Sequence, residues 1–317
     1  MRDITSQTCR PRDRMCVASF FHTTEVHSTL GNIREKLGPL FVSGALIIVT
    51  PISALVSERH AAFAQPASST DRPAGILGTK DHRVRVSSDK WPWSAIGRVN
   101  VVAGTARGLY TGTLIGPRRV LTAAHCLFDT RTNDWVKPSS VHFVVGQVRD
   151  KFLGHSLVES FLTSPQFKYK LEDRPRYDFF DPKMIEHDWA ILMLRDALRV
   201  KPIPVQEVDS AGLLAAVNTG ELALAGYAAD RPYVLSVHKG CAAAINPFEP
   251  SVITHMCDNA PGESGGPLLL LRDGSAVVIG IHSVNFQRFE SQVGYQALIG
   301  GGVSAAEFEA AAKSARQ

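Results

Sequence analysis

Two short strings in this chain carry the residue types that nucleophilic hydrolysis requires. Leu121 to Cys126 reads Leu-Thr-Ala-Ala-His-Cys and contains His125, while Gly262 to Pro267 reads Gly-Glu-Ser-Gly-Gly-Pro and contains Ser264. A serine hydroxyl is a weak nucleophile at neutral pH, so it needs an imidazole base within hydrogen-bond reach and a carboxylate that fixes the tautomer of that imidazole. His125 and Ser264 are therefore the first two candidates for a catalytic triad.

The carboxylate of such a triad is expected between the two strings if the chain order is His, Asp, Ser. Asp188 stands there, at the start of an apolar run that continues to Leu194. Asp173, Asp178 and Asp181 are nearby alternatives. We favour Asp188 because only this residue leads directly into a run that would be buried and would hold the carboxylate rigidly.

The strings TAAHC, DWAIL and GESGGP occur in that order, and together they resemble the three catalytic blocks of chymotrypsin-like serine proteases. The resemblance extends over residues 76 to 300. Gly-x-Ser-x-Gly also fits the nucleophile elbow of α/β-hydrolases, but that fold requires the serine first and a helix after it. Here the histidine comes first, and the chain after Ser264 reads as strand, turn and strand.

The elements that must position these residues are short strands. Runs such as Leu109 to Ile115, Val141 to Gly146 and Ala190 to Leu194 have strand character, whereas Ser304 to Glu307 is a capping box that opens a helix reaching Arg316. The resemblance implies an all-β, chymotrypsin-like double β-barrel with a C-terminal helix. We expect the first barrel over 76–205, the second over 206–302 and the helix in 303–317.

The resemblance also implies an oxyanion hole and a substrate pocket. The backbone N–H groups of Gly262 and Ser264 would form the oxyanion hole. Two signals about the pocket conflict: Asp258 stands six residues before Ser264, where trypsin-like enzymes bind Arg or Lys, whereas His282 follows the pattern of glutamyl endopeptidases, a branch whose pocket histidine binds a glutamate side chain. We favour Glu, although Asn259 departs from the hydroxyl residue usual in that branch. The candidate substrate-binding residues are Asp258, Asn259, His282, Ser283 and Asn285.

The start of the mature chain bears on activation. The stretch from Ile76 to Val84 resembles the mature start of the glutamyl endopeptidases. Glu263 replaces the Asp that pairs with a new N-terminal amine in digestive relatives, so activation by a buried amine stays open. A catalytically inactive relative that acts as a binding module is the rival class, and the presence of all three triad residues disfavours it.

The N-terminal 64 residues predict export. Arg34 and Lys36 precede an uncharged stretch from Leu37 to Val56, and Ala62-Phe63-Ala64 is a small-x-small cleavage site. We expect 1–64 to be an extension with a signal peptide, 65–75 to be a short pro-segment or linker, and the product to be periplasmic or extracellular. The alternative is an uncleaved membrane anchor at 37–56, because 20 residues can span a bilayer.

Cysteine use is consistent with export. Residues after position 64 include Cys126, Cys241 and Cys257. Many relatives pair the cysteine after the catalytic histidine with one on the preceding strand, but Tyr110 stands at that place here. We therefore expect Cys126 to be a free buried thiol and Cys241 to pair with Cys257, the alternative for these two being unpaired thiols.

Composition excludes several classes. The 317 residues are 44% hydrophobic with 25 Gly and 18 Pro, which is typical of a turn-rich globular protein. Beyond residue 64 the chain has 27 Lys and Arg against 25 Asp and Glu, and this small excess argues against a nucleic-acid partner. We expect a monomer that acts on peptide or protein substrates and needs no cofactor or metal.

Overall fold

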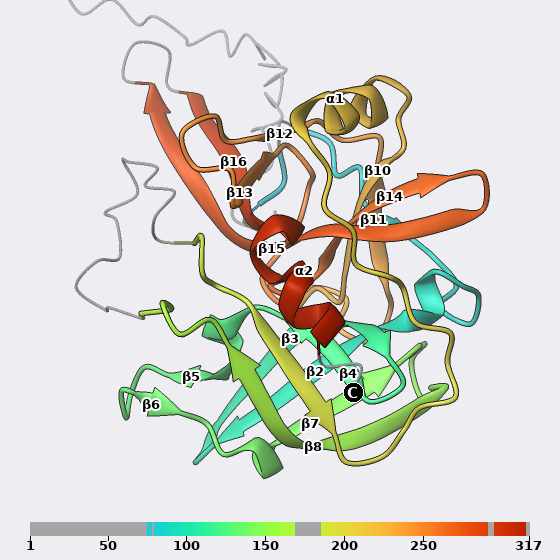
Figure 1. Ribbon diagram of the computed structural model, residues 1–317, viewed down its shortest axis with the longest axis vertical. Coiled ribbons are helices and arrows are strands. Elements are labelled where there is room, and N and C mark those ends of the chain that lie inside the picture. The colour runs from blue at the N-terminus through green and yellow to red at the C-terminus, as the bar shows by residue number, and fades with distance from the viewer. Residues whose placement is uncertain (1–74, 78, 169–184, 291–294, 315–317) are drawn as a thin grey trace, which may run out of the picture. The chain divides into compact units, whose positions relative to one another are not determined.

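The computed structural model describes residues 75–77, 79–168, 185–290 and 295–314 (Figure 1). The expected signal peptide, nearly all of the expected linker, and the alternative carboxylates Asp173, Asp178 and Asp181 lie outside these residues. No helix among the described residues is long and apolar enough to cross a membrane.

Six strands form a closed barrel in the first half of the described chain, in the order β2-β3-β4-β9-β8-β7. All neighbours in this barrel pair antiparallel, and apolar side chains such as Ile96, Leu121 and Ile191 are fully buried. The barrel strands are β2 (Ile96–Ala103), β3 (Ala106–Gly116), β4 (Arg119–Thr122), β7 (Val141–Val145), β8 (Gly154–Thr163) and β9 (Ala190–Leu194). A separate hairpin joins β5 (Phe128–Asp129) and β6 (Asp134–Trp135).

The second half forms an eight-stranded sheet in the order β1-β11-β10-β14-β15-β16-β13-β12. β14 and β15 form the hairpin expected after Ser264, and their turn consists of Asp273 and Gly274, both with positive φ. The strands of this sheet are β1 (Val84–Arg85), β10 (Leu222–Gly226), β11 (Ser236–Lys239), β12 (Ala243–Ile245), β13 (Val252–His255), β14 (Pro267–Arg272), β15 (Ser275–Glu290) and β16 (Tyr295–Ser304). Together the barrel, the sheet and the last helix form the expected chymotrypsin-like double β-barrel.

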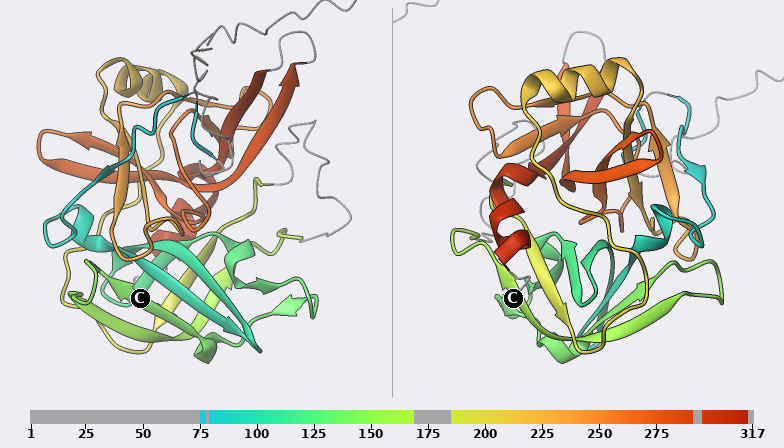
Figure 2. Two further views of the ribbon diagram at one scale, coloured as in Figure 1. Left: turned by 180° about the vertical axis from the view of Figure 1, so that it is seen from behind. Right: turned by 45° about the vertical axis from the view of Figure 1, so that its right-hand side comes forward.

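The last helix, α2 (Ala305–Ser314), contacts both β-structures and lies between them in Figures 1 and 2. Its Ala312 carbonyl accepts a hydrogen bond from Arg119 of β4, and its Glu307 lies 2.7 Å from His187, the residue before Asp188. Phe308 is fully buried in the core. The helix therefore secures the segment that carries the candidate catalytic carboxylate.

Two features differ from the sequence-based expectation. α1 (Ser210–Asn218), capped by the Asp209 side chain on Gly212 N–H, was not predicted. In addition, residues 76 onward were assigned to the first barrel, but β1 pairs with β11 of the larger sheet, with Val84 opposite Val237. The short N-terminal strand completes the edge of that sheet because the six barrel strands already close on one another.

Candidate active site

His125 and Asp188 are brought together by strand pairing. His125 lies in the 3-10 helix Ala124–Leu127, which follows β4 after one residue, and Asp188 is separated from β9 by one residue. Because β4 and β9 pair with Thr122 opposite Ala190, the two ends are adjacent. Asp188 Oδ1 accepts the His125 N–H at 2.8 Å, and Asp188 Oδ2 lies 2.6 Å from His125 Nδ1.

The electrostatics of this pair favour its charged form. Burial alone would lower the pKa of His125, but the Asp188 carboxylate raises that pKa well above its usual value. Burial would raise the pKa of Asp188, yet His125 and the Ser283 hydroxyl, which donates to Oδ2, hold it below its usual value. Asp188 is 3% exposed, so its carboxylate is fixed by the protein and not by water.

Ser264 lies in the tight turn before β14. Its carbonyl accepts the N–H of Thr111 on β3 at 3.0 Å, and Gly265 N–H donates to the His282 carbonyl at 2.8 Å. The Ser264 hydroxyl donates to the Ser283 carbonyl at 3.5 Å. Ser283 thus contacts both candidates, Asp188 through its hydroxyl and Ser264 through its carbonyl.

Within the described residues no hydrogen bond joins Ser264 Oγ to His125. The 3.5 Å bond to Ser283 is at the limit of hydrogen-bond length, so rotation of the hydroxyl away from it costs little. Hydrogen bonds between a nucleophile and its base are commonly long in an enzyme without substrate. Ser264 is therefore linked to Asp188 and His125 through Ser283 and not by a direct hydrogen bond to His125.

The turn that carries Ser264 requires glycine at Gly262. This residue has φ +100°, and a Cβ there would lie 2.7 Å from the Tyr227 carbonyl oxygen. The Gly262 carbonyl accepts a hydrogen bond from the Thr111 hydroxyl at 3.0 Å, which fixes the plane of the peptide. The backbone on both sides of Glu263 is thus anchored to the first barrel.

Cys126 is a buried free thiol beside the candidate base and nucleophile. Its sulfur lies 3.7 Å from His125 Nε2 and 3.9 Å from the Ser264 carbonyl oxygen. Tyr110 presents its ring edge-on to His125, with ring centroids 6.2 Å apart. Cys241 and Cys257 are joined by a disulfide in the second half of the protein.

His282 is the end of a buried chain of hydrogen bonds. The Cys257 N–H donates to His255 Nδ1 at 3.3 Å, and His255 Nε2 lies 3.0 Å from His282 Nδ1. An amide can only donate, so the proton of neutral His255 is on Nε2 and is donated to His282 Nδ1. The proton of neutral His282 is therefore on Nε2. Burial lowers the pKa of His255 to about 3 and lowers that of His282 well below its usual value, so both rings are neutral.

Asp258 is fully engaged by the N-terminal segment. Oδ1 accepts the Leu77 N–H at 2.7 Å, while Oδ2 accepts the His82 N–H and contacts His82 Nδ1, both at 2.8 Å. The Asp258 side chain has no exposed surface. This arrangement leaves little capacity for a substrate cation.

The same carboxylate belongs to the group of described residues whose ligand atoms could surround a metal ion: His82, His238 and Asp258, all within 4.8 Å of one another. His238 Nδ1 already accepts the Asp258 N–H at 2.7 Å, and the two imidazole rings stack with centroids 5.2 Å apart. Each of these three residues therefore makes a hydrogen bond within the group.

Asn259 and Asn285 form a reciprocal pair of side-chain amides. Asn259 Nδ2 donates to Asn285 Oδ1 at 3.0 Å, and Asn285 Nδ2 donates to Asn259 Oδ1 at 2.7 Å. The Asn259 N–H also donates to the Gly75 carbonyl at 3.1 Å. His282 and Ser283 thus contact the Ser264 turn, whereas Asp258 and Asn259 contact the N-terminal segment.

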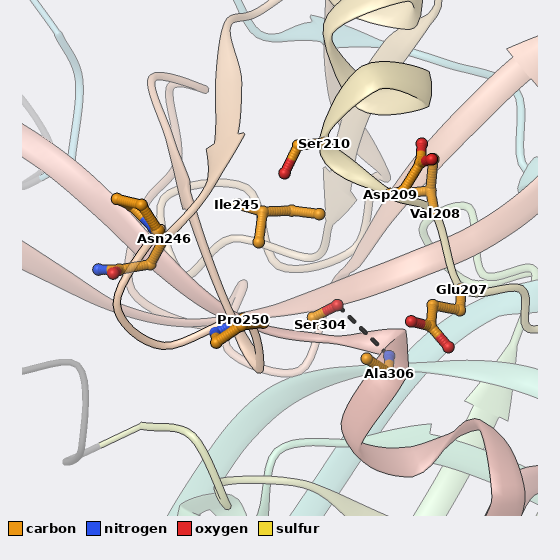
Figure 3. A pocket seen from close by; sticks show the side chains of 10 residues that line it. Glu207, Val208, Asp209, Ser210, Ile245, Asn246, Pro250, Ser304 and Ala306 are labelled. Atoms are coloured by element: carbon orange, nitrogen blue, oxygen red, sulfur yellow. Dashed lines mark hydrogen bonds between the residues drawn. The ribbon is translucent and has the colours of Figure 1, made fainter.

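A cavity of about 290 Å³ lies elsewhere in the second half of the protein. It is lined by residues at the starts of α1 and α2, including Asp209, Ser210 and Ala306 (Figure 3). None of the candidate catalytic or pocket residues lines it.

Sequence reasoning missed His255 and did not assign a role to the Ser283 hydroxyl. No short motif includes His255, because its partner His282 is 27 residues away and reaches it through sheet packing. For Ser283 the signal was its position beside His282 in the string Gly-Ile-His-Ser.

The order of strands and the grouping of His, Asp and Ser define a trypsin-like peptidase architecture. Residues 110–281 match the family model of the trypsin-like peptidase domain, and the chain belongs to that family. No curated protein matches the sequence significantly.

Among solved structures, the chain is similar in fold to a Glu endopeptidase in complex with MPD. The TM-score is 0.54 at 17% sequence identity, and the alignment covers 76% of this chain and 98% of that chain. At this identity the likeness supports the fold and carries no residue-level conclusion.

Proposed function

We propose that the protein is a serine endopeptidase that uses Ser264, His125 and Asp188. The observation that carries this proposal is the connected geometry of the three residues. Asp188 is hydrogen-bonded to both the backbone N–H and the ring of His125. Ser283 links Asp188 to Ser264, because its hydroxyl donates to Asp188 and its carbonyl accepts from Ser264. A solvated surface carboxylate or an ordinary buried histidine would not require this set of contacts.

In the proposed mechanism the Ser264 hydroxyl attacks the scissile carbonyl and His125 takes its proton through Nε2. His125 then returns the proton to the leaving amine, and water hydrolyses the acyl-enzyme by the same route. Asp188 holds the Nδ1–H tautomer and stabilises the imidazolium that forms. The N–H groups of Gly262 and Ser264 stabilise the oxyanion, where each donor contributes about 3 kcal/mol.

We propose that the pocket binds a glutamate side chain. The hydrogen-bond chain from Cys257 through His255 supports a neutral His282 with a proton on Nε2, which is a donor for a carboxylate. The engagement of Asp258 by Leu77 and His82 disfavours the alternative of cleavage after Arg or Lys. The 17% identical Glu endopeptidase is consistent with this reading at the level of fold.

Export to the periplasm or the extracellular space is part of the proposal. The Cys241–Cys257 disulfide supports an oxidising compartment, since such bonds are rare where thiols are kept reduced. The expected signal peptide accounts for the route of export.

We further propose that the first barrel extends over residues 76–205 and the second over 206–302, and that β1 adds a strand to the second.

The test of the peptidase proposal is Ser264→Ala. Loss of the nucleophile costs on the order of 10⁶ in turnover, while the fold measured by circular dichroism stays unchanged. A fluorophosphonate should label Ser264 only in protein that retains His125. Residual activity above about one tenth of wild type would exclude the assignment, since no triad enzyme tolerates loss of its nucleophile that well.

The pocket proposal is tested by matched peptides with Glu, Arg or Phe before the scissile bond. His282→Ala should lower the rate on Glu peptides by about a hundredfold and change the Phe rate little, because a lost charged contact is worth roughly 3 kcal/mol. Asp258→Ser is the comparison variant. A preference for Arg that survives His282→Ala and disappears in Asp258→Ser would replace the glutamyl reading with the trypsin-like one.

A further inference from the structure

Glu263 is a buried carboxyl group between the two residues proposed to form the oxyanion hole. It is 1% exposed, and its Oε2 accepts the Ala260 N–H at 3.1 Å. Its side chain packs against Gly226 of β10, where an added Cβ would lie 2.7 Å from Glu263 Cγ. A carboxylate in such a place is costly unless a cation is close, because burial raises the pKa of Glu263, and the Arg83 guanidinium opposes that rise.

The cation is Arg83, from the N-terminal segment. Arg83 Nη1 lies 3.6 Å from Glu263 Oε1, and both side chains are almost entirely buried. Arg83 is held rigidly, since Asp81 and Asp230 each accept two hydrogen bonds from the guanidinium at 2.9–3.2 Å. A guanidinium with two bidentate partners keeps one position and cannot follow a displaced turn.

A second contact ties the same segment to the other end of the loop. Asp258, five residues before Glu263, accepts N–H groups from Leu77 and His82. Leu77, His82 and Arg83 therefore hold the loop 258–264 at both ends. The turn is formed although the Ile76 nitrogen is a peptide amide that follows Gly75, and among the described residues the cation that contacts Glu263 is Arg83.

We infer that Arg83 is a positioning residue for the Gly262–Ser264 turn, and that it supplies internally the positive charge that would otherwise require a newly released N-terminal amine. This inference rests on the proposed function of Ser264. If Arg83 is removed, Glu263 loses its cation and moves towards water, carrying its chain neighbours Gly262 and Ser264 with it. Catalytic competence then requires residues 77–83 and does not require cleavage before Ile76.

The decisive variants are Arg83→Met, Arg83→Lys and the matched control Arg231→Met. Arg231 contacts the same two carboxylates as Arg83, Asp81 at 2.8 Å and Asp230 at 3.0 Å. The ion pair with Glu263, at 3.6 Å, is made by Arg83. We expect kcat to fall about a hundredfold in Arg83→Met with KM changed less than about threefold, because the loss lies in oxyanion stabilisation. Arg83→Lys should recover at least a tenth of the wild-type kcat, and Arg231→Met should stay within about threefold of wild type.

A second measurement needs no substitution. Wild-type protein is treated with a fluorophosphonate, and the labelled chains are identified by intact mass. Chains that retain residues before Ile76 should label at the same rate as chains that begin at Ile76. This labelling experiment tests the role of Arg83 and residues 77–83 even if Arg83→Met does not fold.

The inference fails if folded Arg83→Met keeps the kcat of Arg231→Met, or if only chains that begin at Ile76 react with the label. Failure of the proposed function looks different, because wild-type protein would then show no His125-dependent labelling of Ser264 at all. The two failures are therefore distinguished within one set of samples.

Discussion

Each candidate catalytic side chain is attached to a strand end by only one or two residues. His125 follows β4, Asp188 precedes β9 and Ser264 precedes β14. The pairing of β4 with β9 sets the distance between base and carboxylate to within a hydrogen bond. At the scale of residues, the proposed chemistry therefore depends on strand register, and a slip of one residue would turn His125 away from Asp188.

The first prediction concerns the pH dependence of Asp188→Asn. In wild type the acidic limb of kcat/KM should have its midpoint above 6.5, because Asp188 raises the pKa of His125 and a protonated imidazole cannot act as base. In Asp188→Asn the limb should move to lower pH, and turnover should fall by about 10⁴ because the tautomer is no longer fixed. The rate on a neutral peptide is measured between pH 5 and 9.

The His125–Asp188 pair should also make the stability of the fold depend on pH, and its two members act in opposite directions. The raised pKa of His125 adds stability below its unfolded value of 6.5, and this contribution is lost as pH rises through the folded pKa. The lowered pKa of Asp188 adds stability above its unfolded value of 3.8, and this is lost as pH falls. Urea unfolding should thus show the greatest difference between wild type and Asp188→Asn between pH 3.8 and 6.5. If the acidic limb of kcat/KM has the same midpoint in wild type and in Asp188→Asn, the assignment of Asp188 is excluded.

Sequence reasoning proposes candidate residues where the chemistry is written in contiguous residues. His125, Asp188 and Ser264 each lie in a short string whose order is informative, and the structure brings their segments together. His255 and Arg83 have no such string, because each acts on a group that is distant in sequence. Arg83 reaches Glu263 across 180 positions, so only the folded chain reveals the contact.

At the scale of elements, the nucleophile turn is packed against the first barrel. Gly265 has φ +79°, and an added Cβ would overlap Thr122 Oγ1 of β4 and the Thr111 carbonyl oxygen of β3. The Thr122 hydroxyl and the Thr111 carbonyl oxygen are both fixed in place, because the hydroxyl donates to this carbonyl at 2.8 Å. The turn and the two barrel strands therefore fix one another.

The second prediction compares Gly265→Ala with Gly274→Ala. Gly274 has a similar φ of +74°, but nothing lies within 4 Å of its added Cβ. Gly274→Ala should lower the free energy of unfolding by about 1 kcal/mol, which is the cost of a left-handed backbone conformation for a residue with a Cβ. Gly265→Ala adds steric overlap in a packed site and should cost at least about 3 kcal/mol and most of the activity. Equal losses in urea titrations would mean that the turn is not held by the barrel.

The elements themselves were predictable where their pattern is strong. The runs at Leu109 to Ile115 and Ala190 to Leu194 became β3 and β9, and the capping box at Ser304 became the start of α2. α1 was missed because only Leu213 and Ala216 are buried among its residues, so the helical apolar stripe is weak. The place of β1 depends on which sheet has a free edge, which no local pattern encodes.

At the scale of the whole molecule, Thr111 connects the two β-structures. Its N–H donates to the Ser264 carbonyl, and its hydroxyl donates to the Gly262 carbonyl while accepting the Tyr227 N–H at 2.9 Å. Tyr227 follows β10 and is fully buried. One strand of the first barrel therefore holds the nucleophile turn and the neighbouring strand of the second sheet in a fixed relation.

The last prediction tests this connection by removing hydroxyls at two positions of β3. Thr111 and Thr113 are both fully buried, but the Thr113 hydroxyl has no hydrogen-bond partner among the described residues. Thr111→Val leaves the Tyr227 N–H and the Gly262 carbonyl without this partner, and each buried unsatisfied group costs about 1–3 kcal/mol. Thr113→Val removes a hydroxyl that is itself unsatisfied, so it should be neutral or stabilising by up to about 1 kcal/mol. Urea unfolding measures both values, and kcat should fall only in Thr111→Val, because only that hydroxyl reaches the catalytic turn. If the two variants lose the same stability, the docking of the β-structures depends on apolar packing and not on Thr111.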